Sequence, residues 1–188
     1  MKPRLSISNA SHREYPYLLR VLAIIRSNQV RPADITYLSM AKRFFYLVVI
    51  MDWASRVVMS WRLSNPLDSA FCIDAMQEVN RYGCPEIFNP DEGCQFTADV
   101  FTDILYSNNI AISMDGQGWW QDNSFIERLW RSVQYEDVYL KPYADAAELR
   151  GSLSSYFKFD NEKRWHQNFD RKTPSMVYFD NLHKQGAA

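Results

Sequence analysis

The sequence predicts an α/β fold in which a mixed five-stranded sheet is flanked by helices. Short β-favouring runs alternate along the chain with longer segments whose apolar residues recur at helical spacing. One run, FFYLVVIMD at 44–52, is apolar on both faces, which is typical of a central strand covered from both sides. The composition is 47% hydrophobic and 15% aromatic over 188 residues, which indicates one globular domain with a substantial core.

Charge and cysteine content exclude several classes of protein. The formal net charge is −1, whereas dedicated DNA-binding domains usually carry a basic excess, so DNA has to be bound locally or with a partner. Three cysteines without a C-x-x-C motif and three histidines offer no zinc-knuckle pattern. No apolar run approaches the roughly 20 residues of a membrane helix, and the N-terminus lacks the apolar centre of a signal peptide. We therefore expect a cytoplasmic protein without a membrane segment.

The first 30 residues combine polar residues with one short apolar patch, YPYLLRVLAII at 15–25. This patch predicts a helix of about two turns within an N-terminal linker or tail. An ordinary tail that packs through its tyrosines is the simpler alternative. The predicted domain, 31–185, contains the other periodic segments.

Two β-favouring runs accompany the central one, ITYLSM at 35–40 and RVVMSWRL at 56–63. Asp34 therefore stands at the start of a strand next to the central strand. Asp52 ends the central strand. Because aspartate is common where strands turn, we interpret Asp52 as a turn residue that bonds the backbone near Ser55.

Two helix and strand pairs follow. Residues 67–83 have helical periodicity, and a short strand, EIFN at 86–89, ends just before Asp91. A second helix, capped by Thr97, precedes a fifth strand, IAISM at 110–114. Ligands gather at strand ends in sheets of this kind, so Asp91 is well placed for a site. The predicted inward residues are Cys72, Ala75, Met76 and Val79 in the first helix and Val100, Phe101, Ile104 and Leu105 in the second.

A strongly amphipathic helix is predicted from Asn123. Its buried stripe comprises Ile126, Leu129, Trp130 and Val133. Glu127, Arg131 and Gln134 share the adjacent face, which therefore presents an acid, a base and an amide. On spacing alone, Glu127 and Arg131 form an ordinary surface pair. In the preceding loop, Trp119 and Trp120 either stack on unpaired bases or fold onto the core, and the sequence favours neither.

The C-terminal part repeats the helical pattern over 144–159 and continues into the most basic segment, DNEKRWHQNFDRKTP at 160–174. Lys163 and Arg164 there suit phosphate contact. For His166 we expect a structural or DNA-backbone role, because nothing pairs it with a nucleophile.

Five motifs carry a resemblance to a known family. They are DITY at 34–37, NPDEGCQFT at 89–97, SMDGQG at 113–118, DNSFIERLWRS at 122–132 and YEDVYL at 135–140. Together they resemble the catalytic core of bacterial insertion-sequence transposases of the IS-three group (OrfB-type), relatives of retroviral integrases. The match runs from about Tyr15 to Tyr178. The resemblance implies an RNase H-like fold with a DDE triad, here Asp34, Asp91 and Glu127, as catalytic residues and metal ligands.

The resemblance also implies the reaction. The three acids would bind Mg²⁺, with Mn²⁺ as a substitute and two ions in the site, in a DNA strand transferase and endonuclease. Insertion-sequence ends and target DNA would be bound by a homo-oligomer at the nucleoid. Residues 1–30 would be a linker remnant that follows a missing helix-turn-helix region, and 31–185 the integrase-type catalytic core. The expected DNA contacts are Arg131, Gln134, Lys163, Arg164, His166, Trp119 and Trp120.

The chain departs from the family pattern at several positions. Arg31 and Pro32 stand where a Trp usually precedes the first acid, Asp160 replaces a Tyr, and Trp165 interrupts an Arg-Pro-His sequence. Gln134 stands where the family has Lys or Arg, which removes a charge-assisted phosphate contact. Two alternatives stay open. One is a truncated or degenerate core without activity that binds or interferes with a full-length transposase, and the other, less favoured, is an RNase H-type nuclease.

Overall fold

The computed structural model describes residues 15–40, 43–91, 93–114 and 124–186. Within them the chain forms one five-stranded sheet with the order β3-β2-β1-β4-β5. β1, β2 and β3 pair antiparallel, and β4 and β5 continue the sheet in parallel from β1. The predicted mixed five-stranded sheet is therefore confirmed. The strands are β1 Val30–Ser39, β2 Phe44–Met51, β3 Val58–Ser64, β4 Ile87–Pro90 and β5 Ala111–Ile112.

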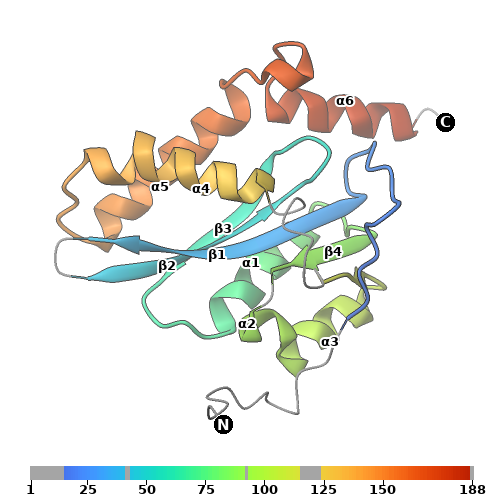
Figure 1. Ribbon diagram of the computed structural model, residues 1–188, viewed down its shortest axis with the longest axis horizontal. Coiled ribbons are helices and arrows are strands. Elements are labelled where there is room, and N and C mark those ends of the chain that lie inside the picture. The colour runs from blue at the N-terminus through green and yellow to red at the C-terminus, as the bar shows by residue number, and fades with distance from the viewer. Residues whose placement is uncertain (1–14, 41–42, 92, 115–123, 187–188) are drawn as a thin grey trace, which may run out of the picture.

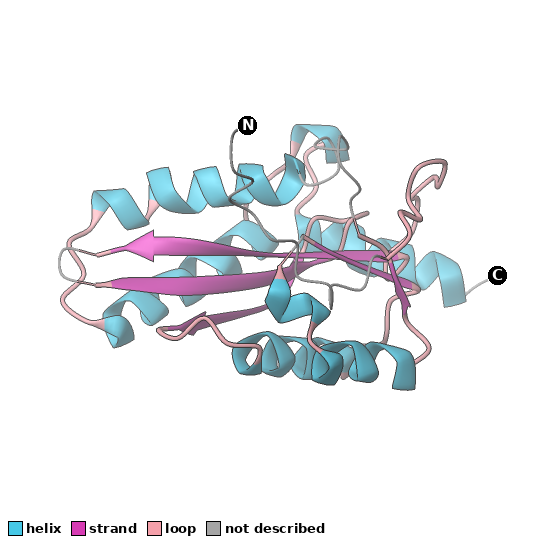
Figure 2. Cartoon of the chain, turned by 60° about the horizontal axis from the view of Figure 1, so that its bottom comes forward, coloured by secondary structure: helices cyan, strands magenta, loops and turns pink. Residues whose placement is uncertain are grey.

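Helices cover both faces of the sheet, so that the fold has three layers (Figures 1 and 2). They are α1 Ala70–Asn80, α2 Cys94–Thr97, α3 Asp99–Ser107, α4 Ser124–Glu136, α5 Ala146–Glu162 and α6 Pro174–Gly186, with the short 3₁₀ helices η1 Val138–Leu140 and η2 Gln167–Phe169. α1, α2 and α3 lie on one face, and α4 and α5 lie on the other. Among the described residues, no helix is both long and apolar enough to cross a membrane.

Two apolar clusters fill the spaces between the layers. Successive residues of a strand point to opposite faces. In β2, Leu47 and Val49 belong to the cluster with α4 and α5, while Val48 and Ile50 belong to the cluster with α1 and α3. This alternation confirms that the apolar run is covered on both sides.

β1 begins earlier than the sequence predicts. Asp34 is expected at the start of the strand, whereas β1 starts at Val30 and Asp34 is its fifth residue. The sequence does not predict this earlier start, because Pro32 has no N–H to donate to the ladder and proline is rare in inner strands. It is tolerated here because the antiparallel ladder with β2 begins only at Ala33.

The expected helix at 15–25 is absent, since none of these residues is helical. The segment is held by tertiary contacts instead. The Leu18 amide donates to Ser113 Oγ at 3.0 Å, and Leu19 belongs to a small buried cluster with Trp53. These contacts outweigh the local helical pattern.

On the other face, the predicted stripe of α1 is confirmed, whereas α3 differs in two details. The buried residues of α1 are Phe71, Cys72, Ala75, Met76 and Val79. Thr97 does not cap α3, because it closes the short helix α2 and Ala98 stands at the N-cap position. Val100 is 63% exposed rather than buried, because the start of α3 at Asp99 turns it outward.

Asp52 is the turn residue that the sequence predicts. Its carboxylate accepts hydrogen bonds from Ser55 N at 2.9 Å, from Ser55 Oγ at 2.6 Å and from Asn28 N at 2.7 Å. These bonds fix the turn between β2 and β3 and leave Asp52 in a structural role.

Candidate active site

Asp34 and Asp91 are brought together by the pairing of β1 with β4. The parallel ladder aligns Ala33 with Pro90, and the Asp91 amide donates to the Ala33 carbonyl at 2.9 Å. The next residue on each strand is an aspartate. Both aspartates line one pocket of about 210 Å³, so two of the three predicted acids share a site.

The surroundings of Asp34 make its carboxylate costly to ionise. Its pKa is raised to about 6, chiefly because burial disfavours the charged form, and the nearby Asp91 adds to the rise. Two donors act in the opposite direction. Trp130 Nε1 donates to Asp34 Oδ2 at 2.6 Å, and the Ile35 amide donates to Oδ1 at 2.6 Å. Asp34 is half-buried and Asp91 is exposed, so one carboxylate of the pair is largely shielded from water and the other is accessible.

This oxygen-only pair fits a hard divalent cation. Carboxylate oxygens are the ligands that Mg²⁺ and Mn²⁺ prefer. Like-charged carboxylates also disfavour each other's ionised form unless a proton or a cation offsets the repulsion. Within the described residues, no group of three His, Cys, Asp or Glu side chains lies close enough to hold a metal ion. The geometry therefore brings together two of the three predicted ligands.

Glu127 is exposed on α4, one turn before Trp130. Trp130 ties this helix to β1 through its hydrogen bond to Asp34. Residues three apart on a helix are neighbours, with Cβ atoms about 5–6 Å apart. α4 is therefore attached to β1 one turn from Glu127, while the role of Glu127 as third ligand stays a prediction.

The faces of α4 are those that the sequence predicts. Its buried residues are Ile126, Leu129, Trp130 and Val133. Arg131 is exposed and Gln134 is partly exposed. Their side chains are accessible to a ligand on the outer flank of the helix, and their roles as DNA contacts stay predictions.

The predicted DNA contacts near the end of α5 have different surroundings. Lys163 is exposed. Arg164 donates to both carboxylate oxygens of Glu136, and its Nε pairs with the buried Asp160 at 3.1 Å. His166 is partly buried, and burial lowers its pKa. Lys163 is thus the accessible cation, whereas Arg164 neutralises carboxylates of the fold. Trp119 and Trp120 lie outside the described residues.

Trp130 contributes to the site in a way that the sequence pattern does not reveal. Its spacing assigns it to the buried stripe, which is correct, but its indole also bonds Asp34. A buried tryptophan usually directs its N–H to a partner. The sequence therefore offers one indirect indication of this role: a buried tryptophan, whose N–H requires an acceptor, lies one turn after Glu127.

Two models of the integrase core domain match the sequence, one over residues 25–118 and one over residues 108–174. Transposase InsF for insertion sequence IS3A of Escherichia coli (strain K12) is 28% identical over 144 residues, which are 75% of this chain and 50% of InsF. The chain thus spans about half the length of the curated relatives it matches. The predicted resemblance to insertion-sequence transposases is confirmed.

Solved structures agree with the sequence matches. The HTLV-2 integrase catalytic core domain in complex with magnesium has a TM-score of 0.67 at 19% identity, covering 83% of this chain and 99% of that domain. A chain of the simian T-cell lymphotropic virus intasome has a TM-score of 0.72 at 18% identity, covering 90% of this chain and 60% of that one. The fold is therefore the RNase H-like fold of retroviral integrase cores. Since the first matching model alone covers half of the sequence, the chain belongs to the integrase core domain family.

Proposed function

We propose that this chain is the catalytic core of an insertion-sequence transposase, which cuts DNA strands at the ends of its element and joins them to target DNA. The observation that carries the proposal is the pairing of Asp34 with Asp91 in one pocket. Family membership supplies the reaction class, and the acidic pair supplies a site for it in this chain.

Asp34 and Asp91, with Glu127 as the third ligand, would hold Mg²⁺ or Mn²⁺, with two ions expected. The HTLV-2 core of the same fold is a magnesium complex. A bound metal supplies Lewis acidity that activates the attacking oxygen and stabilises the leaving one. Asp34 has to be ionised to act as a ligand. Because its pKa is raised to about 6, protons compete with the metal below that pH.

DNA would lie against the outer flank of α4, next to Glu127. Arg131 adds positive charge to this flank, and Gln134 offers only a neutral amide. Lys163 provides a second accessible cation at the end of α5. Because the net charge is only −1, these local contacts should give weak, salt-sensitive binding without sequence preference.

A separate DNA-addressing region would supply that preference. In this proposal residues 31–185 are the core, and residues 1–30 are the linker that follows a helix-turn-helix region. Several copies of the chain would act together on DNA, in the cytoplasm at the nucleoid. The intasome match supports assembly only as a property of a protein with the same fold.

A strand-transfer assay tests the proposal. It uses DNA that carries the ends of the insertion sequence, Mg²⁺ or Mn²⁺, and the separate helix-turn-helix region supplied to the chain. Asp34→Asn, Asp91→Asn and Glu127→Gln should each abolish strand joining while circular dichroism shows an intact fold. Asp103→Asn removes an exposed carboxylate of α3 and is the matched control. If Glu127→Gln joins strands at the wild-type rate, the triad assignment is wrong. A wild type that joins no ends but blocks an active transposase would instead support the inert alternative.

A further inference from the structure

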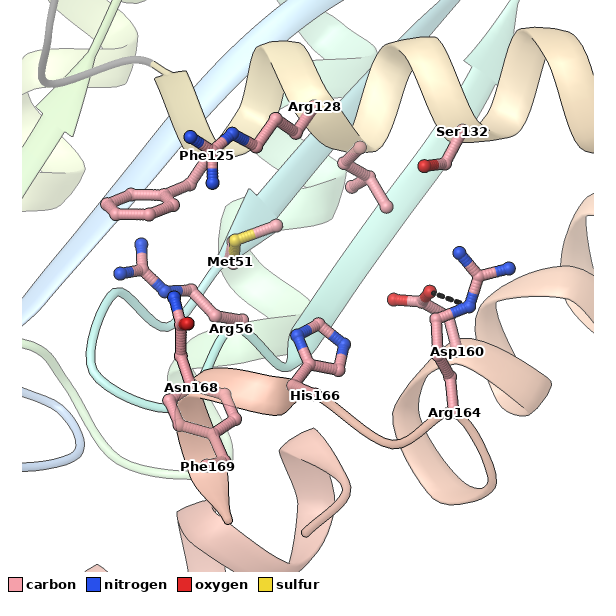
Figure 3. Close-up of a pocket in the computed structure, with 11 residues that line it drawn as sticks. Met51, Arg56, Phe125, Arg128, Ser132, Asp160, Arg164, His166, Asn168 and Phe169 are labelled. Carbon is pink, nitrogen blue, oxygen red and sulfur yellow. Dashed lines mark ion pairs between the residues drawn. The ribbon is translucent and has the colours of Figure 1, made fainter. Parts of the chain in front are cut away.

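A second pocket lies on the opposite flank of α4 from Glu127. It has a volume of about 150 Å³ and is enclosed by α4, the turn between β2 and β3, and the segment that follows α5 (Figure 3). α4 lines it with Phe125, Arg128 and Ser132, which are three and four residues apart and so share one side of the helix. The pocket is therefore separate from the acidic pair, although both sites use α4.

Positive charge dominates the wall of this pocket. Arg56, Arg128 and Arg164 line it against one carboxylate, that of Asp160. Asp160 pairs with Arg164 at 3.1 Å, and Figure 3 shows this pair at one end, away from the guanidinium groups of Arg56 and Arg128 near Phe125. Among the described lining residues, no carboxylate faces Arg56 and Arg128 at their end of the pocket.

Two buried nitrogen atoms of the lining residues have no hydrogen-bond partner among the described residues. Arg56 Nη1 and His166 Nε2 are buried, and within the described part of the chain neither makes a hydrogen bond. Buried polar atoms are nearly always bonded, so each exception requires an explanation. Asp52 attracts Arg56 from outside the pocket, but its oxygens accept hydrogen bonds from Asn28 and Ser55. A ligand with acceptor atoms would satisfy both nitrogens.

Electrostatics and backbone strain agree with this explanation. Burial lowers the pKa of Arg56 to about 9, with Asp52 opposing the decrease and Arg128 adding to it. Burial also lowers the pKa of His166, helped by the charges of Arg164 and Arg56. In addition, Arg56 has a φ of 65°, a left-handed conformation that arginine rarely adopts. Strained residues of this kind cluster at binding and catalytic sites.

We infer that this pocket binds a small oxyanion of the phosphate class, held by Arg56 and Arg128 with His166 as a third contact. A phosphate group offers several acceptor oxygens, which the planar guanidinium group binds in a bidentate manner. The volume suits one such group and is below the roughly 300 Å³ at which ordinary ligand pockets begin. Inorganic phosphate and the terminal phosphate of a nucleotide or DNA strand share this chemistry.

Thermal unfolding of the chain with increasing inorganic phosphate tests the site, with chloride added to keep the ionic strength constant. The wild type should gain stability in a saturable manner, because binding to the folded state stabilises it. Arg128→Met keeps the apolar stem, removes the charge and should weaken phosphate binding by about tenfold or more. Arg81→Met removes the same charge from an exposed position at the end of α1, outside both proposed sites, and should leave phosphate binding unchanged.

Arg56→Met separates loss of the site from loss of the fold. It should abolish the response to phosphate while the protein stays folded without phosphate, because methionine keeps an apolar stem against the Phe125 ring over which the guanidinium lies. An NMR titration should show that sulfate raises the pKa of His166, since an anion favours the charged imidazole. A single-stranded oligonucleotide with and without a 5′-phosphate distinguishes a terminal phosphate from the free ion. The inference is overturned if phosphate gives no saturable stabilisation, or if Arg81→Met weakens the response as much as Arg128→Met does.

Discussion

Replacing Asp34 with asparagine should stabilise the metal-free protein at neutral pH. In the folded chain the pKa of Asp34 is raised from 3.8 to about 6, and two pKa units correspond to roughly 3 kcal/mol at a pH above both values. The single carbonyl oxygen of asparagine replaces two acceptors, those that serve Trp130 and Ile35, and one lost bond costs about 1 kcal/mol. The expected net gain is about 2 kcal/mol, or roughly 4–8 °C in Tm for a domain of this size.

The sign of this effect should change with pH. A raised carboxyl pKa means that the folded state binds more protons than the unfolded state between pH 3.8 and about 6. The stability of the wild type therefore falls as the pH rises through that window. The asparagine variant does not titrate at this position. It should be the less stable protein by roughly 0.5 kcal/mol near pH 4, where the unfolded wild type is already partly ionised, and the more stable one above pH 7.

Urea unfolding of both proteins at about pH 4 and pH 8, with a chelator present, measures the difference. Asp103→Asn controls for the loss of one exposed carboxylate. Mg²⁺ should then raise the stability of the wild type but not that of the Asp34→Asn variant, because this variant lacks one of the carboxylates that would hold the ion. A variant less stable than the wild type at both pH values would show that Asp34 is an ordinary hydrogen-bonded carboxylate, and the argument for a metal site would fail.

Substitutions at four other positions test the roles assigned to α4 and to the end of α5. Gln134→Lys should strengthen DNA binding about tenfold in fluorescence anisotropy; unchanged binding with a Tm lower by several degrees would show a packed residue. Trp130→Phe should raise the pKa of Asp34 by about 1–2 units in a carboxyl NMR titration, because the ionised form loses a donor; an unchanged pKa would refute the bond. Arg164→Gln should lower the free energy of unfolding in urea by about 1–3 kcal/mol, because it leaves the buried Asp160 carboxylate unpaired. Lys163→Gln should have little effect on stability. Equal effects of the two substitutions would contradict the structural role of Arg164.

Local periodicity was sufficient to predict the helices that cover the sheet. The stripe of Ile126, Leu129 and Val133 is buried in α4, since a helical period depends only on neighbouring positions. Periodicity failed where distant contacts decide the outcome. Residues 15–25 have a helical pattern but form no helix, and β1 extends through Pro32 because its first residues pair with β4.

The meeting of Asp34 and Asp91 was not predictable from local pattern. The two residues lie side by side because the register aligns Ala33 with Pro90, and the register of parallel strands joined by a long crossover is set by the whole fold. Only the family resemblance pointed to this pair. Neither periodicity nor the family resemblance predicts the phosphate-class pocket, because Arg56 and His166 lie in a turn and a loop without periodicity.

The departures from the family pattern fall into two groups in the structure. Arg31 is buried and donates to Asn28 Oδ1 at 2.7 Å, and the buried Asp160 pairs with Arg164, so each of these two residues has a polar partner within the fold. Gln134 differs because it lies on the accessible flank of α4 and changes charge rather than packing. Of these departures, Gln134 is therefore the one expected to affect strand transfer. If the missing cation limits the reaction, Gln134→Lys should raise strand joining in step with DNA affinity. Wild-type joining that an added cation does not improve would mean that the departures leave the reaction intact.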